Sequence, residues 1–179
     1  MRDDFRLVAK IYDRIIKPKD VIPWKKYICD LTADSTLLDV GGGTGRIADA
    51  LENCFSSVII YDISLPMLKE TKNKSGKIAR VCGKVENLAL AKYYFDSVIM
   101  IDTLHHVEDH QKALSAILKV LKPGGIFVIE EPDIRKFPVK IIALMEKLLF
   151  MRSHFLTPEE VNVWIRSEER RVGKECRYG

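Results

Sequence analysis

The sequence is poor in aromatic residues and cysteine, and it lacks a long apolar run. Aromatics make up 8% of its 179 residues, and the four cysteines (Cys29, Cys54, Cys82 and Cys176) form no CxxC pair. Their irregular spacing argues against a zinc site or a disulfide framework and favours a reducing cytoplasm. The longest apolar stretch, Val139–Met151, contains three charged residues. A bilayer span needs about 20 mostly apolar residues, so this stretch is too short to cross a membrane.

Charge of neither sign is in large excess. The chain has 29 Lys and Arg against 25 Asp and Glu, which gives a net charge of +4. It shows no basic run of the kind that binds nucleic acid, and its charged N-terminus, MRDDFR, shows no secretory signal. Since 47% of the residues are hydrophobic, we expect a soluble cytoplasmic globular domain with a real core and no nucleic-acid partner.

The end of the chain has a different character, because residues 166–179 carry no apolar pattern. Arg166–Cys176 resembles the in-frame translation of a DNA sequencing adapter; the alternative is a solvated, frayed C-terminus. We therefore expect a domain over residues 1–165 and a non-native tail over 166–179. Three parts are expected to follow one another in that domain: N-terminal helices in 1–31, an α/β core in 36–133 and C-terminal helices in 137–165.

Short apolar runs alternate with segments of helical periodicity. Five runs predict buried strands: Thr36–Val40, Ser57–Tyr61, Ala79–Cys82, Phe95–Ile101 and Ile126–Glu130. Helices are predicted over Gly45–Cys54, from Ser64 to about Lys74, from about Asp109 to Leu121, and from a capping box at Thr157–Glu160. This alternation predicts a doubly wound α/β domain with a mainly parallel sheet and helices on both faces.

A glycine-rich turn follows the first predicted strand. Gly41, Gly43 and Gly45 allow a tight turn that brings backbone N–H groups close to a ligand. The carboxylate of Asp39, beside this turn, suits a ligand with an ammonium group better than a pyrophosphate. Asp62 ends the second strand, where a carboxylate can accept both hydroxyls of a ribose. The alternatives are a strand-to-helix turn without a ligand and an Asp that only caps the next helix.

Together these segments resemble the class I S-adenosylmethionine-dependent methyltransferases, above all the small-molecule group that includes the ubiquinone and menaquinone methylases. The likeness covers roughly residues 12–165 and is carried by LLDVGGGTGR, VIIYDIS, VENLAL, FDSVIMIDTLHHVED and LKPGGIFVIEEPD. It implies a Rossmann-like methyltransferase fold, S-adenosylmethionine as cofactor and a small-molecule acceptor, apolar or quinone-like. Such proteins normally complete the sheet with an antiparallel strand pair. This chain has no apolar run left for that pair, so we expect the fold without it.

The resemblance also implies a set of cofactor-binding residues. They are Asp39, Gly41, Gly43 and Gly45 for the methionine portion, Asp62 for the ribose, Ile63 and Met67 against the adenine, Val85 and Glu86 in the loop at the adenine, and Asp102 in the segment beneath the sulfonium. Lys84 departs from the family pattern, which often has an acid there to accept a hydrogen bond from the adenine amino group. Lysine offers only donors, so either Glu86 substitutes or the adenine is held more weakly.

Two adjacent histidines, His105 and His106, follow the fourth predicted strand. A neutral imidazole can remove a proton from a nucleophile near neutral pH, so either is a candidate general base; the alternative is a structural role. A metal pair is disfavoured, because adjacent side chains are expected to diverge and no third ligand is apparent. His110 and His154 are expected to be surface or capping residues.

The acceptor side is less legible in the sequence. Acceptor recognition is expected from Phe5–Ile16, which includes Tyr12, and from Val139–Met151. We interpret Val139–Met151 mainly as a helix that faces the core. The alternatives are that it lines a pocket for an apolar acceptor or rests on a membrane surface. Two other functions stay open. One is a cofactor-binding domain without turnover; the other is a nicotinamide-dependent oxidoreductase, against which Asp39 and Arg46 argue.

Overall fold

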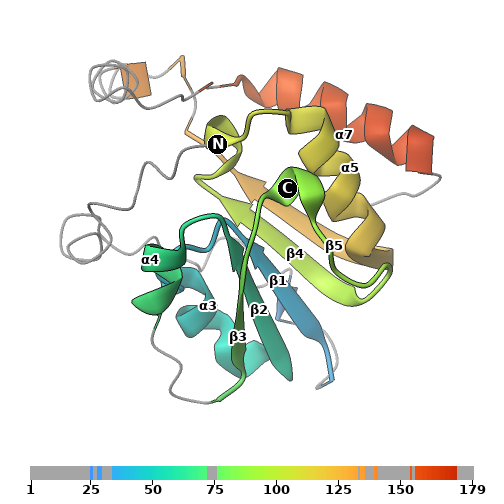
Figure 1. Ribbon diagram of the computed structural model, residues 1–179. Helices are drawn as coiled ribbons and strands as arrows, with labels where there is room; N and C mark the ends of the chain where they lie inside the picture. The colour runs from blue at the N-terminus through green and yellow to red at the C-terminus, as the bar shows by residue number, and fades with distance from the viewer. Residues whose placement is uncertain are drawn as a thin grey trace.

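The five apolar runs form one parallel sheet in the computed structural model, which describes residues 25, 28–29, 34–71, 76–132, 134–135, 139–140, 154 and 156–172. The strands lie in the order β3-β2-β1-β4-β5 (Figure 1). Their bounds are β1 Thr36–Val40, β2 Ser57–Asp62, β3 Ile78–Cys82, β4 Phe95–Ile101 and β5 Leu121–Glu130. All five predicted strands are confirmed. β5 begins earlier than predicted because Leu121 already pairs with Phe95, before the Pro-Gly-Gly turn and a register shift.

Helices cover both faces of the sheet, as predicted (Figure 1). On one side lie α3 (Arg46–Leu51) and α4 (Leu65–Lys69), and on the other lie α5 (His110–Val120) and α7 (Pro158–Val172). Three short 3-10 turns also lie between these elements: η1 Glu52–Cys54, η2 Val85–Asn87 and η3 Leu104–His106.

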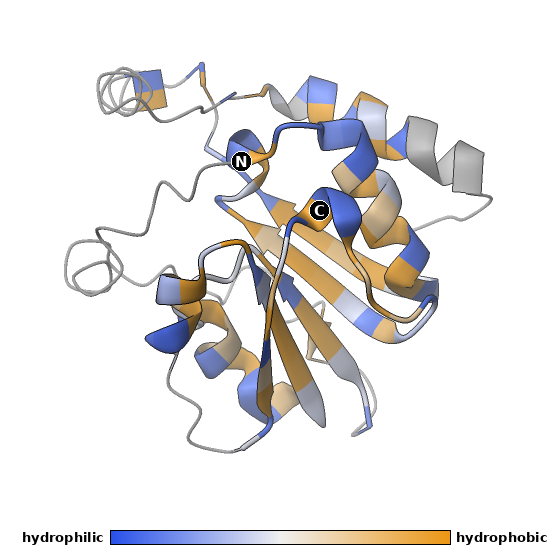
Figure 2. Cartoon of the chain, viewed as in Figure 1, coloured by the Kyte–Doolittle hydropathy of each residue, from blue (hydrophilic) through white to orange (hydrophobic). Residues whose placement is uncertain are grey.

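The core is double, one part on each side of the sheet. Leu38 of β1 packs in the cluster that contains Phe127, whereas the next residue back, Leu37, packs in the cluster that contains Phe55. Successive side chains of a strand point to opposite faces, so a strand buried on both faces must be apolar throughout. Figure 2 shows strands that are largely hydrophobic and helices in which hydrophilic and hydrophobic residues are mixed.

Side-chain caps lie at the starts of α4, α5 and α7. Ser64 accepts a hydrogen bond from the Met67 N–H at 3.4 Å, and Asp109 caps α5 in the same way. At the start of α7, Thr157 N donates to the Glu160 carboxylate at 2.8 Å, and Glu160 N donates to Thr157 Oγ1 at 3.3 Å. This reciprocal pair is the predicted capping box.

Two helices end where the sequence did not place them. The prediction for α4 was wrong at its end: it stops at Lys69, because Glu70 N bonds to Met67 O in a tighter turn at 3.0 Å. Helix α7 continues beyond residue 165 to Val172. That residues 166–179 are non-native stays a prediction.

The two segments predicted to recognise the acceptor, Phe5–Ile16 and Val139–Met151, lie outside the described residues except for residues 139–140. Among the described residues, no helix is both long and apolar enough to cross a membrane.

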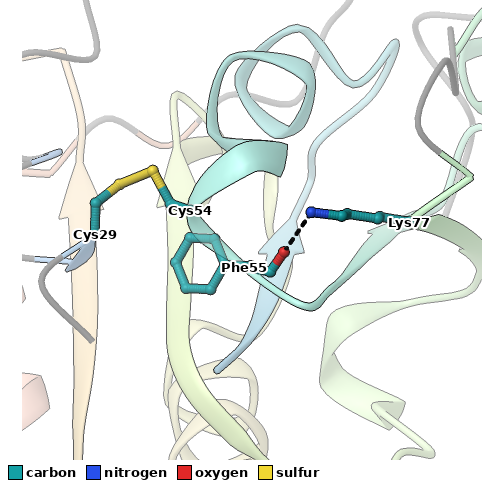
Figure 3. The surroundings of a disulfide bond; sticks show 4 residues. All are labelled: Cys29, Cys54, Phe55 and Lys77. Carbon is teal, nitrogen blue, oxygen red and sulfur yellow. Dashed lines mark hydrogen bonds between the residues drawn. A yellow bond between two sulfur atoms is a disulfide. The ribbon is translucent and has the colours of Figure 1, made fainter. Parts of the chain in front are cut away.

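A disulfide joins Cys29 to Cys54, a pair that the prediction against a disulfide framework did not foresee (Figure 3). The bond links positions 25 residues apart whose Cα atoms lie 5.1 Å from each other. Ile28 is fully buried in the same cluster as Phe55, and this packing brings Cys29 against the end of η1. The spacing of the cysteines along the sequence does not indicate this contact. The disulfide also removes the cysteine-based argument for a reducing compartment.

We expect the double variant Cys29→Ser/Cys54→Ser to be less stable than the wild type by about 3 kcal/mol, because opening a loop of this length restores unfolded-state entropy. Urea denaturation without reductant measures the difference. Cys82→Ser is the control, since Cys82 is an exposed free thiol. A reductant should lower the stability of the wild type and of Cys82→Ser, but not that of the double variant. Equal stability of all three proteins without reductant would contradict the disulfide.

Candidate active site

The glycine turn lies at the carboxyl edge of the sheet, between β1 and α3. Gly41 N donates to Tyr61 O at 2.7 Å and so extends the β1–β2 pairing into the turn. Gly41 and Gly45 have φ values of +73° and +79°, which glycine adopts without strain. A Cβ at Gly45 would also lie 2.7 Å from Ile60 Cδ1. Backbone conformation and close packing therefore both require glycine here.

Asp39 is buried directly beneath this turn, with 2% of its surface exposed. A Cβ at Gly42 would lie 2.5 Å from Asp39 Oδ2. Within the described part of the chain, that oxygen is buried without a hydrogen-bond partner. Burial, and then repulsion from Asp62, raise the pKa of Asp39 to about 7, although a backbone hydrogen bond from Ala48 lowers it. A buried carboxyl oxygen without a donor is costly, and a cationic hydrogen-bond donor would satisfy it.

Asp62 connects the glycine turn to the start of α4. Its carboxylate accepts from Gly43 N at 2.9 Å and from Ser64 N at 2.7 Å. Met67 reaches the same place, since a Cβ at Gly43 would lie 3.1 Å from Met67 Cε. Met67 is buried and Ile63 half-buried. The structure therefore brings Asp62 and Met67 together at the glycine turn, with Ile63 next to Asp62 in the chain.

The loop after β3 is tied to the loop after β4. Val85 and Glu86 are buried in η2, and Glu86 Oε1 accepts from Glu108 N at 3.2 Å. Lys84 Nζ lies 3.5 Å from the Glu108 carboxylate. Both Lys84 and Glu86 thus hold the Glu108 segment, a role that sequence reasoning did not assign to either. That Val85 and Glu86 meet an adenine stays a prediction.

The loop after β4 packs directly on the glycine turn. A Cβ at Gly41 would collide with the Thr103 side chain, whose Oγ1 donates to Ile101 O at 2.9 Å. The preceding residue, Asp102, has a φ of +50°, which is unusual for a residue other than glycine. Asp102 N donates to Glu130 O at 2.8 Å, which holds this conformation. Predicted site residues after β1 and β4 therefore share one edge of the sheet.

Glu131 is the residue of this edge that sequence reasoning missed. Its carboxylate accepts from Thr103 N at 2.8 Å, Leu104 N at 2.6 Å and His105 N at 3.4 Å, and it lies 2.5 Å from His105 Nδ1. The available signal was the position of Glu131, one residue beyond the last predicted strand, at the edge where α/β sheets bind ligands.

The predicted divergence of the two adjacent histidines was wrong. The single turn of η3 places the rings of His105 and His106 with their centroids 4.0 Å apart. His110 is half-buried and stacks on Trp164 at 5.1 Å instead of lying on the surface, whereas His154 is exposed. No group of three or more potential ligands suited to a metal ion occurs among the described residues.

The two rings differ in their surroundings. Burial, together with the neighbouring His105, lowers the pKa of His106 to about 3. His106 is therefore neutral at physiological pH and a weak proton acceptor there, because a general base works best with a pKa near the working pH. His105 is buried against the Glu131 carboxylate. That either histidine acts as a general base stays a prediction.

Comparison with known proteins gives a family and a set of structural neighbours. Residues 38–129, about half of the chain, match the family described as "Methyltransferase domain". Demethylmenaquinone methyltransferase of Renibacterium salmoninarum is 32% identical over 134 residues, which are 73% of this chain and 56% of that protein. The chain thus spans about half the length of the curated relatives it matches.

Two solved structures share the fold. A SAM-dependent methyltransferase of Thermotoga maritima, a possible histamine N-methyltransferase, superposes with a TM-score of 0.74 at 23% identity, covering 94% of this chain and 80% of that one. Phosphoethanolamine N-methyltransferase 2 of Haemonchus contortus, in complex with S-adenosyl-L-methionine, superposes with a TM-score of 0.71 at 20% identity, covering 89% and 40%. At these identities the likeness shows the fold alone.

We expect Asp39→Asn to stabilise the ligand-free protein at pH 8 by on the order of 2 kcal/mol, because it removes a buried charge. A raised native pKa means that the wild type loses stability as the pH rises from about 4 to 7. The gain should therefore be clearly smaller at pH 5 than at pH 8. Urea denaturation at both pH values checks this, with Asp49→Asn in α3 as the control. An equal gain at pH 5 and pH 8 would contradict the buried charge.

We expect the ring of His106 to stay neutral from pH 8 down to pH 5, because its native pKa is lowered to about 3. NMR titration of the histidine Cε1–H signals measures this, and His106→Gln assigns the resonance. The lowered pKa also means that its contribution to stability is lost as the pH falls from about 6.5 towards 3. A midpoint near 6.5 for His106 would show that the ring is exposed to water.

Proposed function

The chain belongs to the methyltransferase-domain family, and from this premise we propose that it binds S-adenosylmethionine and transfers the methyl group to a small molecule. S-adenosylmethionine is the methyl donor typical of the family. The proposed cofactor site is the carboxyl edge of β1, β2 and β4, where the glycine turn and the loop after β4 meet.

One observation carries this proposal: the unsatisfied Oδ2 of Asp39 beneath the glycine turn. The ammonium group of the cofactor's methionine portion would supply both the hydrogen bond and the positive charge that this oxygen lacks. A pyrophosphate would instead place negative charge above an acid. The same observation therefore argues against a nicotinamide-dependent oxidoreductase.

The remaining predicted residues fit the other parts of the cofactor. Asp62, which ends β2 at the glycine turn, offers carboxylate oxygens of the kind that accept ribose hydroxyls. Met67 beside Gly43, and Ile63 next to Asp62, offer apolar surface for the adenine. Val85 would contribute its backbone N–H from η2.

Methyl transfer requires little covalent chemistry from the residues of the chain. The sulfonium of S-adenosylmethionine supplies an activated methyl group, so the residues of the chain have to bind, orient and exclude water. In this proposal the Thr103 segment, packed on Gly41, forms the floor beneath the transfer. His105 is the candidate to accept a proton from the acceptor.

For the acceptor, we propose a small apolar compound of the quinone class in its reduced form. The support is the likeness to enzymes named for demethylmenaquinone and for ubiquinone and menaquinone biosynthesis. A hydroquinone is an electron-rich nucleophile, whereas the quinone itself is electrophilic, so the reduced form suits attack on a methyl sulfonium.

Calorimetric titration with S-adenosylhomocysteine tests the cofactor site. We expect saturable binding by the wild type and at least about tenfold weaker binding by Asp62→Ala, which loses charge-assisted hydrogen bonds. Asp34→Ala, in the exposed turn before β1, is the control and should bind like the wild type. Thermal melting confirms that all three are folded. Binding of NADH in place of S-adenosylhomocysteine would instead support the oxidoreductase.

Incubation with demethylmenaquinone, reduced in place, and isotopically labelled S-adenosylmethionine tests the acceptor. Mass spectrometry should find a label-bearing product one methyl group heavier. Cofactor binding without a methylated product from a panel of hydroquinones, phenols and amines would favour a domain that binds the cofactor without turnover.

A further inference from the structure

The side chain of Glu131 has more hydrogen-bond partners than the capping of one helix start requires. A helix start is commonly capped by one acceptor, but here three successive N–H groups and an imidazole nitrogen converge on one side chain. The side chain is 11% exposed and His105 is 5% exposed, so water does little to replace these contacts.

A contact of 2.5 Å joins Glu131 Oε2 to Nδ1 of His105, and the role of Nδ1 in it depends on the tautomer of the ring. An ionised carboxylate offers only acceptors, so Nδ1 must be the donor. A neutral His105 is then in the Nδ1–H form, and Nε2 is the basic atom of the ring. Whatever group meets Nε2 must donate a hydrogen bond to it.

We propose that Glu131 is a positioning residue for methyl transfer, holding His105 so that Nε2 takes the proton of an acceptor whose nucleophile carries an acidic O–H or C–H. This inference rests on the proposed function and narrows its acceptor to compounds that lose a proton. In the step, the acceptor's electron pair forms the bond to the methyl carbon and the carbon–sulfur bond breaks with its electrons going to sulfur. The acceptor's proton goes to Nε2.

The arrangement distinguishes His105 from its neighbour. His106 has its pKa lowered to about 3, and the centroid of its ring lies 4.0 Å from that of His105. The proton that His105 takes at Nε2 is on the far side of the ring from Nδ1, which lies 2.5 Å from the Glu131 carboxylate. The link to Glu131 crosses 26 residues of sequence and is made by the pairing of β4 with β5.

Glu131→Gln separates positioning from capping. The glutamine keeps one carbonyl oxygen, which can accept from Thr103 N and Leu104 N as Oε1 does now. Its NH₂ group would face His105 Nδ1 and force that nitrogen to become the acceptor. We therefore expect the loop after β4 to keep its conformation while the ring of His105 changes from the Nδ1–H form to the Nε2–H form. Glu130→Gln is the matched control, with the same charge change one residue earlier.

Nitrogen NMR of histidine-labelled protein reads the tautomer directly, without any acceptor. We expect the Nδ1–H form of His105 in the wild type and in Glu130→Gln, and the Nε2–H form in Glu131→Gln. We also expect all three to bind S-adenosylhomocysteine within about threefold of one another. The same tautomer in Glu131→Gln and the wild type would overturn the proposal. So would a parallel loss of S-adenosylhomocysteine binding, because it would show that Glu131 only holds the loop.

Kinetics with reduced demethylmenaquinone as the probe gives the second readout. We expect kcat of Glu131→Gln to fall at least about tenfold with KM for S-adenosylmethionine little changed, since a wrong tautomer removes a base without removing a binding contact. Unchanged kcat would overturn the proposal. Absence of turnover in the wild type would overturn the proposed acceptor instead, and the tautomer spectra would then decide the role of Glu131 by themselves.

Discussion

The burial of one carboxyl group beneath the glycine turn is the constraint on which the rest of the site depends. Asp39 lies near the end of β1, in the centre of a parallel sheet, with Asp62 at the end of the neighbouring strand. Water cannot solvate its Oδ2, and the nearby acid adds repulsion. A stable fold gains nothing from this arrangement, whereas a site for a cationic ligand does. The glycine at position 42 follows from it, because a Cβ at Gly42 would collide with that carboxylate.

The loop after β4 is the second half of the site, and it is organised from outside itself. Backbone N–H groups of Thr103 and Leu104 donate to the carboxylate of Glu131, which follows β5. The N–H of Asp102 donates to the carbonyl oxygen of Glu130. The pairing of β4 with β5 therefore sets the position of Thr103 against the glycine turn. The glycine turn and the loop after β4 are thus held together at one edge of the sheet.

Much of the fold could be predicted from the sequence because its signals are local. A strand buried on both faces must be an apolar run, and a capping box such as Thr157–Glu160 is read from four adjacent residues. The glycine turn and the acids beside it were found in the same way. The features that the sequence did not predict depend on contacts between residues that are far apart in the sequence. The disulfide of Cys29 follows from packing of the preceding residue, and the role of Glu131 follows from strand pairing.

The central claim is that Asp39 recognises the ammonium group of the cofactor, and the most direct measurement is the number of protons released on binding. Titration with S-adenosylhomocysteine at pH 6.5, in buffers of different ionisation enthalpy, gives this number. A carboxyl group with a pKa of about 7 is largely protonated there in the ligand-free protein, and a bound cation ionises it. We expect the wild type to release at least about half a proton on binding, and Asp39→Asn to lose this release. Binding of the same strength without proton release would contradict it.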